Sequence, residues 1–331
     1  MKFRYTLSAI LSLVLLSSCA GVLGAINPTP VVAEAADQSQ VALEDALTPS
    51  PVPFQFNLPI PGAEPVSGWR PPLYPIPWAV SPYDHFYFAR PIAADNVNWP
   101  LAQYRYGGVF FAPNIVHTGV DIDAADGTPI LAAGPGTVVS SDWGLYTEAP
   151  GNQEDPYGMA VVVRHDFGYK DQALYTIYAH MSKLLALVGS HVETGDVLGL
   201  VGATGATTGP HLHFEVRVGK NTFYNTSNPE LWMTPPQGWG VLVGRILDEK
   251  GYFLNQLGIQ VQSTVARSPL RTVMTYGIGS VNRDDYYQEN FVLSDLPAGI
   301  YKISLSYKPE DSDTYEDHET WVEIFPGQVS F

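Results

Sequence analysis

Short apolar stretches separated by glycine-containing turns make up most of this chain after about residue 83. Four of these stretches have the length and the branched or aromatic residues of β-strands, at 161–164, 174–178, 197–201 and 211–218. Turn signals such as Gly134-Pro135-Gly136 divide them. Only 181–187 resembles a helix, and it is short. The pattern predicts a mainly β fold with an antiparallel sheet.

A second series of strand-like segments follows residue 237. They lie at 241–247, 259–263, 291–293, 300–307 and 321–325, and their spacing is typical of a small β-sandwich. A chain of 331 residues accommodates about two domains of roughly 100–200 residues each. We therefore expect a first folded domain at 83–236 and a β-sandwich domain at 237–331.

The first residues have the features of an export signal. Two basic residues precede an apolar run at 7–16, which suits a signal peptide and is shorter than the about 20 residues of a membrane span. Leu16-Ser-Ser-Cys19 follows and resembles a bacterial lipoprotein box, with the chain's only cysteine at the acylated position. We expect a signal peptide at 1–19, a lipid anchor on Cys19 and a location outside the cytoplasm, facing the cell wall or periplasm. The alternative is an ordinary signal peptide cleaved near Ala25 and a secreted protein.

Residues 20–82 are dense in proline and lack helical or strand periodicity. Such a composition favours extended polyproline geometry, so we expect a linker between the anchor and the first domain. Trp69, Tyr74 and Trp78 are expected to pack the end of this linker onto the domain that follows.

The balance of charge limits the possible partners. The formal net charge is −16, and nucleic-acid binding requires a basic surface, so we expect no nucleic-acid partner. Hydrophobic residues make up 45% of the chain and charged residues 15%, which is typical of a folded protein. A neutral, cationic or zwitterionic partner is easier to accommodate.

Five residues of the first domain have the types and spacing of one metal-dependent hydrolytic site: His117, Asp121, His180, His211 and His213. The pairs 117/121 and 211/213 are separated by even numbers, so an extended chain presents both members of each pair on one face. A catalytic zinc ion takes about three protein ligands and leaves one position open. Three of the five residues can therefore hold a metal ion, and two histidines remain to move protons.

His117-Thr-Gly-Val-Asp121, Tyr178-Ala-His180 and Gly209-Pro-His-Leu-His-Phe-Glu215 together resemble the lysostaphin/LytM-type zinc endopeptidases, which cleave bacterial peptidoglycan. The resemblance covers about residues 88–218. It implies one zinc ion bound by His117, Asp121 and His213, and catalytic roles for His180 and His211. All five positions match, so the chain does not resemble the inactive members that only activate other hydrolases.

The implied function is that of an exported zinc endopeptidase acting on the peptide cross-links of peptidoglycan. Amide hydrolysis needs a group that accepts the proton of water, a donor to the oxyanion and an acid for the leaving amine. We expect His211 to be the base or proton shuttle and His180 the oxyanion donor, with the exchanged roles left open. The alternatives are a non-hydrolytic envelope protein that binds wall peptides or activates an amidase, and a surface adhesion module.

Several neighbours have two interpretations. Glu215 has the strand parity of His213, so it either orients that residue or pairs with Arg217. Asp123 is expected either to support the site or to cap a turn, and His85, His165 and His191 are expected to be structural or solvated. The glycine-rich loop at 202–209 is expected to let the backbone of a substrate approach the metal, and the loop at 147–156 to form a wall of the cleft.

Leu296-Pro-Ala-Gly-Ile-Tyr301 resembles the carboxypeptidase-regulatory-like, transthyretin-like sandwiches. This resemblance implies that 237–331 is a spacer or an interaction module, with an envelope protein as the possible partner. We expect its one histidine, His318, to lie in an acidic loop, away from any metal site.

Overall fold

The computed structural model describes residues 73–92, 101–112, 115–145 and 151–331, which all fall in one compact unit. The predicted signal peptide, Cys19, Trp69 and the linker up to residue 72 lie outside the described residues. No helix in the described ranges is long and apolar enough to cross a membrane.

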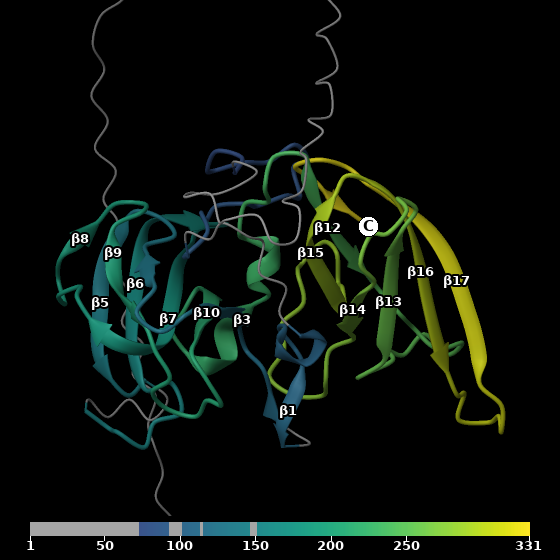
Figure 1. Ribbon diagram of the computed structural model, residues 1–331, viewed down its shortest axis with the longest axis horizontal. Helices are drawn as coiled ribbons and strands as arrows, with labels where there is room; N and C mark the ends of the chain where they lie inside the picture. Colours follow the sequence, from purple (N-terminus) through teal and green to yellow (C-terminus); the bar gives the residue numbers. More distant parts are fainter. Residues whose placement is uncertain (1–72, 93–100, 113–114, 146–150) are drawn as a thin grey trace, which may run out of the picture. The chain divides into compact units, whose positions relative to one another are not determined.

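The described residues contain a nine-stranded sheet that carries most of the predicted site. Its strands are β3 (Val120–Asp123), β4 (Pro129–Leu131), β5 (Gly136–Trp143), β6 (Met159–Tyr169), β7 (Gln172–Leu184), β8 (His191–Val192), β9 (Val197–Val201), β10 (His211–Val218) and β11 (Thr226–Ser227). They pair in the order β11-β10-β7-β6-β5-β8, while β3 pairs with β10 and β9 pairs with β4 and β7 (Figure 1). All of these pairs are antiparallel.

The two faces of β10 have different roles. Leu212, Phe214 and Val216 belong to the main hydrophobic core, because successive strand side chains point to opposite faces. The odd-numbered residues from His211 to Arg217 therefore share the other face. This alternation places the histidine pair of the sequence motif on the face away from the main core.

The described residues also form a smaller antiparallel sheet and three short 3₁₀ helices. The small sheet pairs β1 (Val109–Ala112) with β2 (Ile115–Val116). The 3₁₀ helices are η1 (Ala102–Tyr104), η2 (Phe223–Asn225) and η3 (Pro229–Leu231).

The short helix expected at 181–187 is wrong. Strand β7 continues to Leu184, and Met181, Lys183 and Leu184 pair with β9. Backbone pairing with β9 therefore overrides the weak local preference for a helix. The prediction of a mainly β, antiparallel fold is confirmed.

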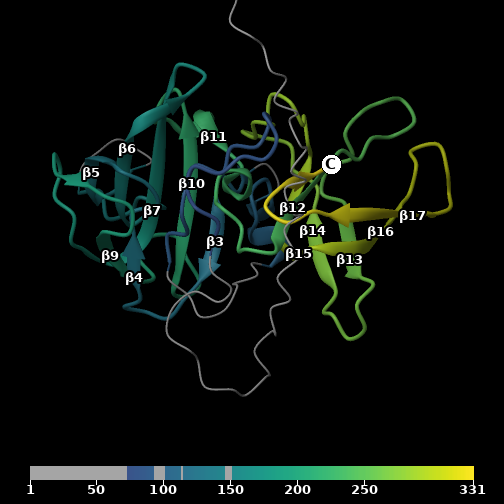
Figure 2. The same cartoon turned by 90° about the horizontal axis from the view of Figure 1, so that it is seen from above.

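Two further sheets are built from the residues after Trp239. One joins β12 (Trp239–Gly244), β15 (Phe291–Pro297) and β18 (Val329–Ser330), and the other joins β13 (Gly258–Ser263), β14 (Arg271–Met274), β16 (Gly299–Tyr307) and β17 (Glu316–Ile324) (Figure 2). Strands β12 and β18 are parallel, and the other pairs are antiparallel. Leu242 and Leu293 of the first sheet share a hydrophobic core with Ile259 and Ile303 of the second. The shared core is what a sandwich requires, while the transthyretin-like assignment and the domain boundaries stay predictions.

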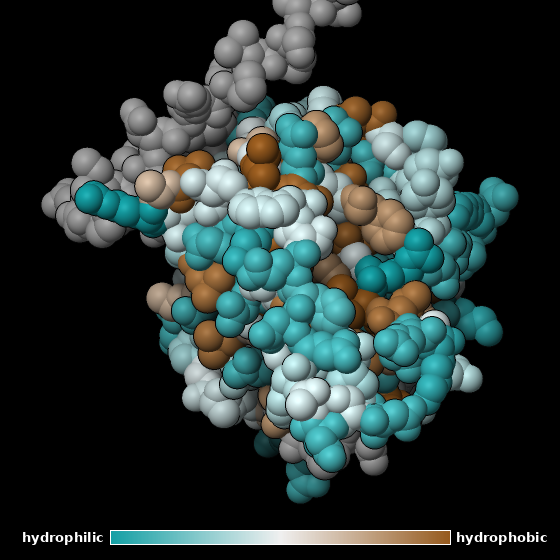
Figure 3. Space-filling view, turned by 90° about the vertical axis from the view of Figure 1, so that its right-hand side faces the viewer, coloured by the Kyte–Doolittle hydropathy of each residue, from teal (hydrophilic) through white to brown (hydrophobic). Residues whose placement is uncertain are grey.

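Within the described residues, strand β17 pairs with β16 alone and is therefore an edge strand. Most of its residues are exposed, and acidic side chains such as Glu319 and Glu323 oppose pairing with another chain. Hydrophilic and hydrophobic residues are interspersed on the side of the molecule where β17 lies (Figure 3).

The prediction that His318 lies in a loop is wrong, because this residue pairs with Leu305 inside the β16–β17 ladder.

Residues 73–82, the part of the predicted linker that the structure describes, contact residues that are distant in the sequence. The indole nitrogen of Trp78 donates to the carbonyl oxygen of Gly327 at 2.9 Å, and the ring of Tyr74 stacks on Trp78. The amide of Gly238 donates to the hydroxyl of Tyr74 at 3.2 Å. Trp78 also pairs with Phe86, its amide donates to the carbonyl oxygen of that residue at 2.9 Å, and it packs against the main core. The amide of Tyr74 donates to the carbonyl oxygen of Pro235 at 3.3 Å. Tyr74 and Trp78 therefore pack on the domain that follows the linker, as expected, and they also contact residues near the sheets after Trp239.

Replacing Leu198 with alanine tests the core face of β9. Leu198 is completely buried, whereas its neighbour Val197 is 46% exposed. We expect Leu198→Ala to lower the free energy of unfolding by about 2–5 kcal/mol, because it removes buried methyl groups and leaves a cavity. The matched change Val197→Ala should alter it by less than about 0.5 kcal/mol. Urea denaturation measures both, and equal losses would contradict the alternation of this strand.

Candidate metal centre

Asp121 and His213 lie opposite one another on paired strands. Strands β3 and β10 are in a register that makes these two residues direct cross-strand neighbours. Nδ1 of His213 lies 2.9 Å from Oδ1 of Asp121. The sheet alone therefore brings two of the three predicted metal ligands together.

His117 reaches the same point from outside the nine-stranded sheet. It follows β2, and its Nε2 lies 2.9 Å from Nδ1 of His213 and 3.0 Å from Oδ1 of Asp121. The extended strand expected across 117–121 begins only at Val120. Before it, the chain passes β10 so closely that a Cβ at Gly119 would overlap the carbonyl oxygen of Phe214 and lie 2.9 Å from the His213 ring. A residue without a side chain is required there for the ligands to meet.

The outer ring nitrogens of both histidines contact oxygens that only accept hydrogen bonds. Nδ1 of His117 lies 3.2 Å from the carbonyl oxygen of Arg105, and Nε2 of His213 lies 3.1 Å from Oε1 of Glu215. Each outer nitrogen therefore carries a hydrogen, and the inner nitrogen faces the other two candidate ligands. The two inner nitrogens and the carboxylate of Asp121 converge on one point. A cation is the species that stabilises such an arrangement.

The spacing of the three donor atoms suits a small ion. All ligand atoms of His117, Asp121 and His213 lie within 4.8 Å of one another, with nearest separations of 2.9, 3.0 and 2.9 Å. A tetrahedral zinc ion with bonds of about 2.0–2.1 Å separates its ligands by about 3.3–3.4 Å. Two imidazoles and one carboxylate are also donors that zinc accepts, whereas calcium and magnesium favour oxygen ligands alone. The residues fit zinc after a small widening.

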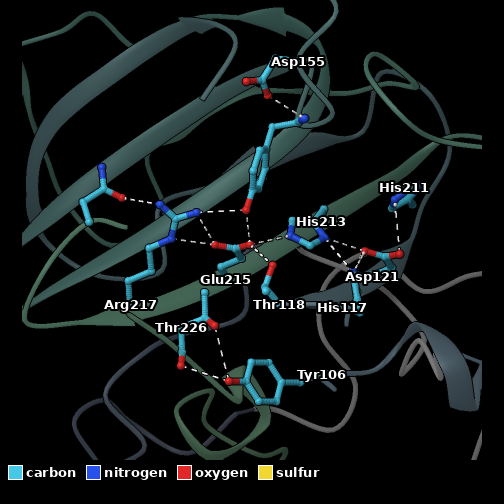
Figure 4. A network of polar contacts seen from close by, with 12 residues as sticks. Tyr106, His117, Thr118, Asp121, Asp155, His211, His213, Glu215, Arg217 and Thr226 are labelled. Atoms are coloured by element: carbon cyan, nitrogen blue, oxygen red, sulfur yellow. Dashed lines mark hydrogen bonds and ion pairs between the residues drawn. The ribbon is translucent and has the colours of Figure 1, made fainter. Parts of the chain in front are cut away.

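Glu215 is completely buried and makes several contacts behind His213 (Figure 4). Its Oε1 accepts hydrogen bonds from the hydroxyls of Thr118 and Tyr157 at 2.5 and 2.7 Å, in addition to the contact with His213. Its Oε2 accepts from Nε of Arg217 at 2.8 Å. The sequence predicted that Glu215 either orients His213 or pairs with Arg217, and the structure contains both contacts. One carboxylate oxygen contacts His213, and the other accepts from Arg217. The carboxylate is thereby held in one orientation toward the ring of His213.

The charges around the site favour a positive ion. Burial lowers the pKa of His213, but its hydrogen bonds with Asp121 and Glu215 outweigh burial and raise that pKa to about 9. Burial raises the pKa of Asp121, but His117 and His213 hold it well below its usual value. The two shifts have complementary causes, because Asp121 and Glu215 stabilise the protonated ring of His213, while His117 and His213 stabilise the negative charge of Asp121. A metal ion takes the place of that proton when it binds.

The rings of His180 and His211 lie next to each other, with centroids 4.7 Å apart, and the His180 ring lies 5.7 Å from that of His213. Nδ1 of His180 donates to the carbonyl oxygen of Thr204 at 2.8 Å. Burial and the neighbouring His213 and His211 lower the pKa of His180 to about 3, so its ring is neutral. Its φ of 62° lies in the left-handed region, which is uncommon for histidine and occurs preferentially at functional sites.

His211 is oriented by its own loop. Its Nδ1 lies 2.9 Å from the carbonyl oxygen of Gly209, and its Nε2 lies 3.6 Å from Oδ2 of Asp121. All five predicted site residues therefore lie together, three as candidate ligands and two beside them.

The other histidines and loops are arranged differently. His165 is buried between the carbonyl oxygen of Pro135 and the hydroxyl of Thr176, and His191 is exposed next to Asp166. Part of the predicted wall loop, 146–150, lies outside the described residues. The glycine-rich loop orients His180 through Thr204, a role that the sequence did not indicate.

Three supporting residues were not found from the sequence, namely Arg105, Thr118 and Tyr157. Arg105 acts through its carbonyl oxygen, which no sequence pattern identifies. Tyr157 approaches Glu215 from a turn in which its amide donates to Asp155 at 2.9 Å. Only Thr118, directly after His117, is near a motif residue in the sequence.

Replacing Glu215 with glutamine tests its effect on the metal centre. The amide removes the charge that stabilises the His213 side of the site, so we expect the affinity for zinc to fall by about 10–100-fold. Competition with a chromophoric chelator measures the affinity, and thermal melting checks that Arg217 tolerates the change. The exposed Glu193, changed to glutamine, is the matched control. An unaltered affinity in a folded Glu215→Gln protein would show that the contact has no such effect.

The sequence was compared with known protein families and curated proteins. Residues 115–225 match peptidase family M23. The chain is 38% identical over 103 residues to the DD-carboxypeptidase/endopeptidase Mpg of Neisseria meningitidis. This match covers 31% of this chain and 20% of Mpg. The chain is 39% identical over 102 residues to the peptidoglycan DD-endopeptidase ShyC of Vibrio cholerae, again 31% of this chain and 20% of the relative. The chain thus spans about a fifth of the length of these relatives.

Among solved structures, the catalytic domain of lysostaphin from Staphylococcus simulans is 28% identical, with a TM-score of 0.33, over 38% of this chain and 86% of that one. The sequence matches, rather than this structural likeness, support the assignment. The matched range contains His117, Asp121, His180, His211 and His213. Residues 115–225 therefore belong to peptidase family M23, and the chain is homologous over this range to the LytM/lysostaphin-type endopeptidases.

Proposed function

We propose that this chain is an exported, zinc-dependent endopeptidase that hydrolyses the peptide cross-links of bacterial peptidoglycan. The observation that carries the proposal is the convergence of two imidazole nitrogens and one carboxylate at His117, Asp121 and His213. Two further imidazoles, those of His180 and His211, lie next to this point. Three ligands and two proton-transfer groups are the set that a hydrolytic zinc site requires.

We infer the class of substrate from the names of the relatives. Mpg is named as a carboxypeptidase and endopeptidase, and ShyC is named as a peptidoglycan endopeptidase. The range that matches peptidase family M23, residues 115–225, contains the whole candidate site, so we propose the same class of bond for this chain. The net charge of −16 is in keeping with a wall peptide rather than a nucleic acid.

A bound zinc ion supplies Lewis acidity, which lowers the pKa of a coordinated water and polarises the scissile carbonyl. The protein's own residues must accept the proton of the attacking water, stabilise the oxyanion and protonate the leaving amine. His180 and His211 are the candidates for these roles.

The two rings make the same kind of contact. Nδ1 of His180 donates to the carbonyl oxygen of Thr204 at 2.8 Å, and Nδ1 of His211 lies 2.9 Å from the carbonyl oxygen of Gly209. In both rings Nε2 is therefore the nitrogen that can take part in proton transfer. We propose that one of the two rings accepts the proton of the attacking water, and that the other donates to the oxyanion and then to the amine.

The location of the protein is proposed from the sequence alone. The apolar run at 7–16 and the box that ends at Cys19 favour export and lipid attachment, which would hold the enzyme at a bacterial membrane next to its substrate. An envelope protein that binds 237–331 remains a proposal of the same kind.

Incubating the purified protein with peptidoglycan tests the function. We expect new amine termini and soluble muropeptides to form, a chelator to abolish them, and added zinc to restore them, because the ligands must hold the ion for hydrolysis. Mass spectrometry of the products identifies the bond that is cleaved. Zinc binding without any cleavage would instead support a non-hydrolytic envelope protein, and protein that holds no transition metal would refute the proposal.

Replacing His180 or His211 with alanine separates proton transfer from metal binding. Neither ring is a proposed ligand, so zinc content should stay near that of the unaltered protein. Hydrolysis should fall by about 10²–10⁴-fold, since each variant lacks a group for proton transfer. Elemental analysis and muropeptide release measure the two effects. Loss of zinc in His180→Ala would count against its assignment, and His117→Ala, which should lose the metal, is the comparison.

A further inference from the structure

His117 differs from the other two candidate ligands in what holds it. Asp121 and His213 are paired within the nine-stranded sheet. His117 instead makes three contacts with the preceding segment 105–108: its amide donates to the carbonyl oxygen of Gly108 at 2.8 Å, its carbonyl oxygen accepts from Gly107 at 2.8 Å, and its ring donates to Arg105 at 3.2 Å. The position of this ligand therefore depends on segment 105–108.

Segment 105–108 is held in turn by residues from the C-terminal part of the chain. The amide of Gly277 donates to the carbonyl oxygen of Gly107 at 2.7 Å. Tyr276 packs on Gly107, where an added Cβ would lie 2.5 Å from Cδ1 of Tyr276. The buried ring of Tyr106 meets that of Tyr276 edge to face, with centroids 5.4 Å apart. The hydroxyl of Tyr106 also accepts from the amide of Asn282 at 2.9 Å.

The side chain of Arg105 makes a second connection to the same part of the chain. It forms a buried ion pair with Glu230. Oε2 of Glu230 also accepts from the amide and the hydroxyl of Ser294, at 2.8 and 2.7 Å, and Ser294 belongs to β15. Arg105 is therefore fixed through its guanidinium to the C-terminal sheets while its carbonyl oxygen accepts from His117.

The loop after β14 also touches the strand that leads into His117. A Cβ at Gly277 would overlap Cγ2 of Val109 and lie 3.0 Å from Cγ1 of Val116. Val116 is buried and directly precedes the ligand. The backbone at Gly277 therefore lies against the β1–β2 sheet with no room for a side chain.

We propose that the C-terminal part of the chain positions the metal ligand His117, through the loop at 276–282 and through Ser294. Tyr276, Gly277 and Asn282 are positioning residues, because they act through segment 105–108 and touch neither the metal nor the substrate. This role differs from the spacer or interaction module that the sequence resemblance implied. The inference takes from the proposed function only that His117 binds a metal ion.

Alanine at Gly277 is the direct test, made in the full chain. The new methyl group pushes the β1–β2 sheet away, so we expect the affinity for zinc to fall about tenfold or more, the size of effect seen when a supporting contact of a ligand is lost. Gly258→Ala is the matched control, because its new Cβ would meet only Met274, at 3.7 Å, in the same C-terminal sheets. Tyr106→Phe is a milder variant that removes the hydroxyl bonded to the amide of Asn282 and to the carbonyl oxygen of Thr226.

Three measurements separate positioning from general damage. Chelator competition gives the zinc affinity, the visible spectrum of the Co²⁺-loaded protein reports the geometry of the ligands, and thermal melting reports folding. In Gly277→Ala and Tyr106→Phe we expect weaker binding and an altered Co²⁺ spectrum, with activity restored by excess zinc. Gly258→Ala should match the unaltered protein in all three.

The outcomes distinguish this inference from the proposed function. If the unaltered protein binds no zinc, the proposed function fails. If it binds zinc and both folded variants bind it equally well with an unchanged Co²⁺ spectrum, the positioning role is refuted while the proposed function stands. If Gly277→Ala does not fold, Tyr106→Phe decides between these results.

Discussion

The hydrogen bond between His213 and Glu215 is the contact on which the candidate site depends. It commits the outer nitrogen of the ring to donating, so the inner nitrogen faces Asp121 and His117, where a metal ion would replace its proton. Glu215 keeps its charge although it is buried, because Arg217 and two hydroxyls contact its oxygens. A buried carboxylate with fewer partners would favour protonation, and a protonated Glu215 would no longer select this tautomer.

The three candidate ligands are supported in two different ways. Asp121 and His213 are fixed by a backbone ladder within one sheet, which has low freedom to move. His117 is supported by a segment whose own contacts extend to Gly277 and Ser294. The family match ends at residue 225, so this second support comes from residues beyond the matched range. The candidate ligand His117 is therefore connected to the C-terminal sheets by direct contacts of segment 105–108.

Local pattern was sufficient where one backbone ladder sets the geometry. The two-residue spacing of His211 and His213 predicted a common face, and β10 has this alternation. The pattern failed where a partner strand decides the conformation. Residues 181–184 extend β7 because β9 pairs with them, and His318 lies in a strand because β16, the preceding strand in the chain, pairs with it. The residues of each segment alone do not show that a partner strand supplies its backbone hydrogen bonds.

The sequence alone determined the mainly β fold and predicted which five residues lie together as a candidate metal site, because residue type and strand parity are local properties. It left open whether Glu215 faces the ligand or Arg217, and it gave no indication that Arg105, Tyr157 or Gly277 supports the site. Those answers required the tertiary structure. A carbonyl oxygen that selects a tautomer, or a glycine that allows two segments to touch, acts through contacts between residues far apart in the chain.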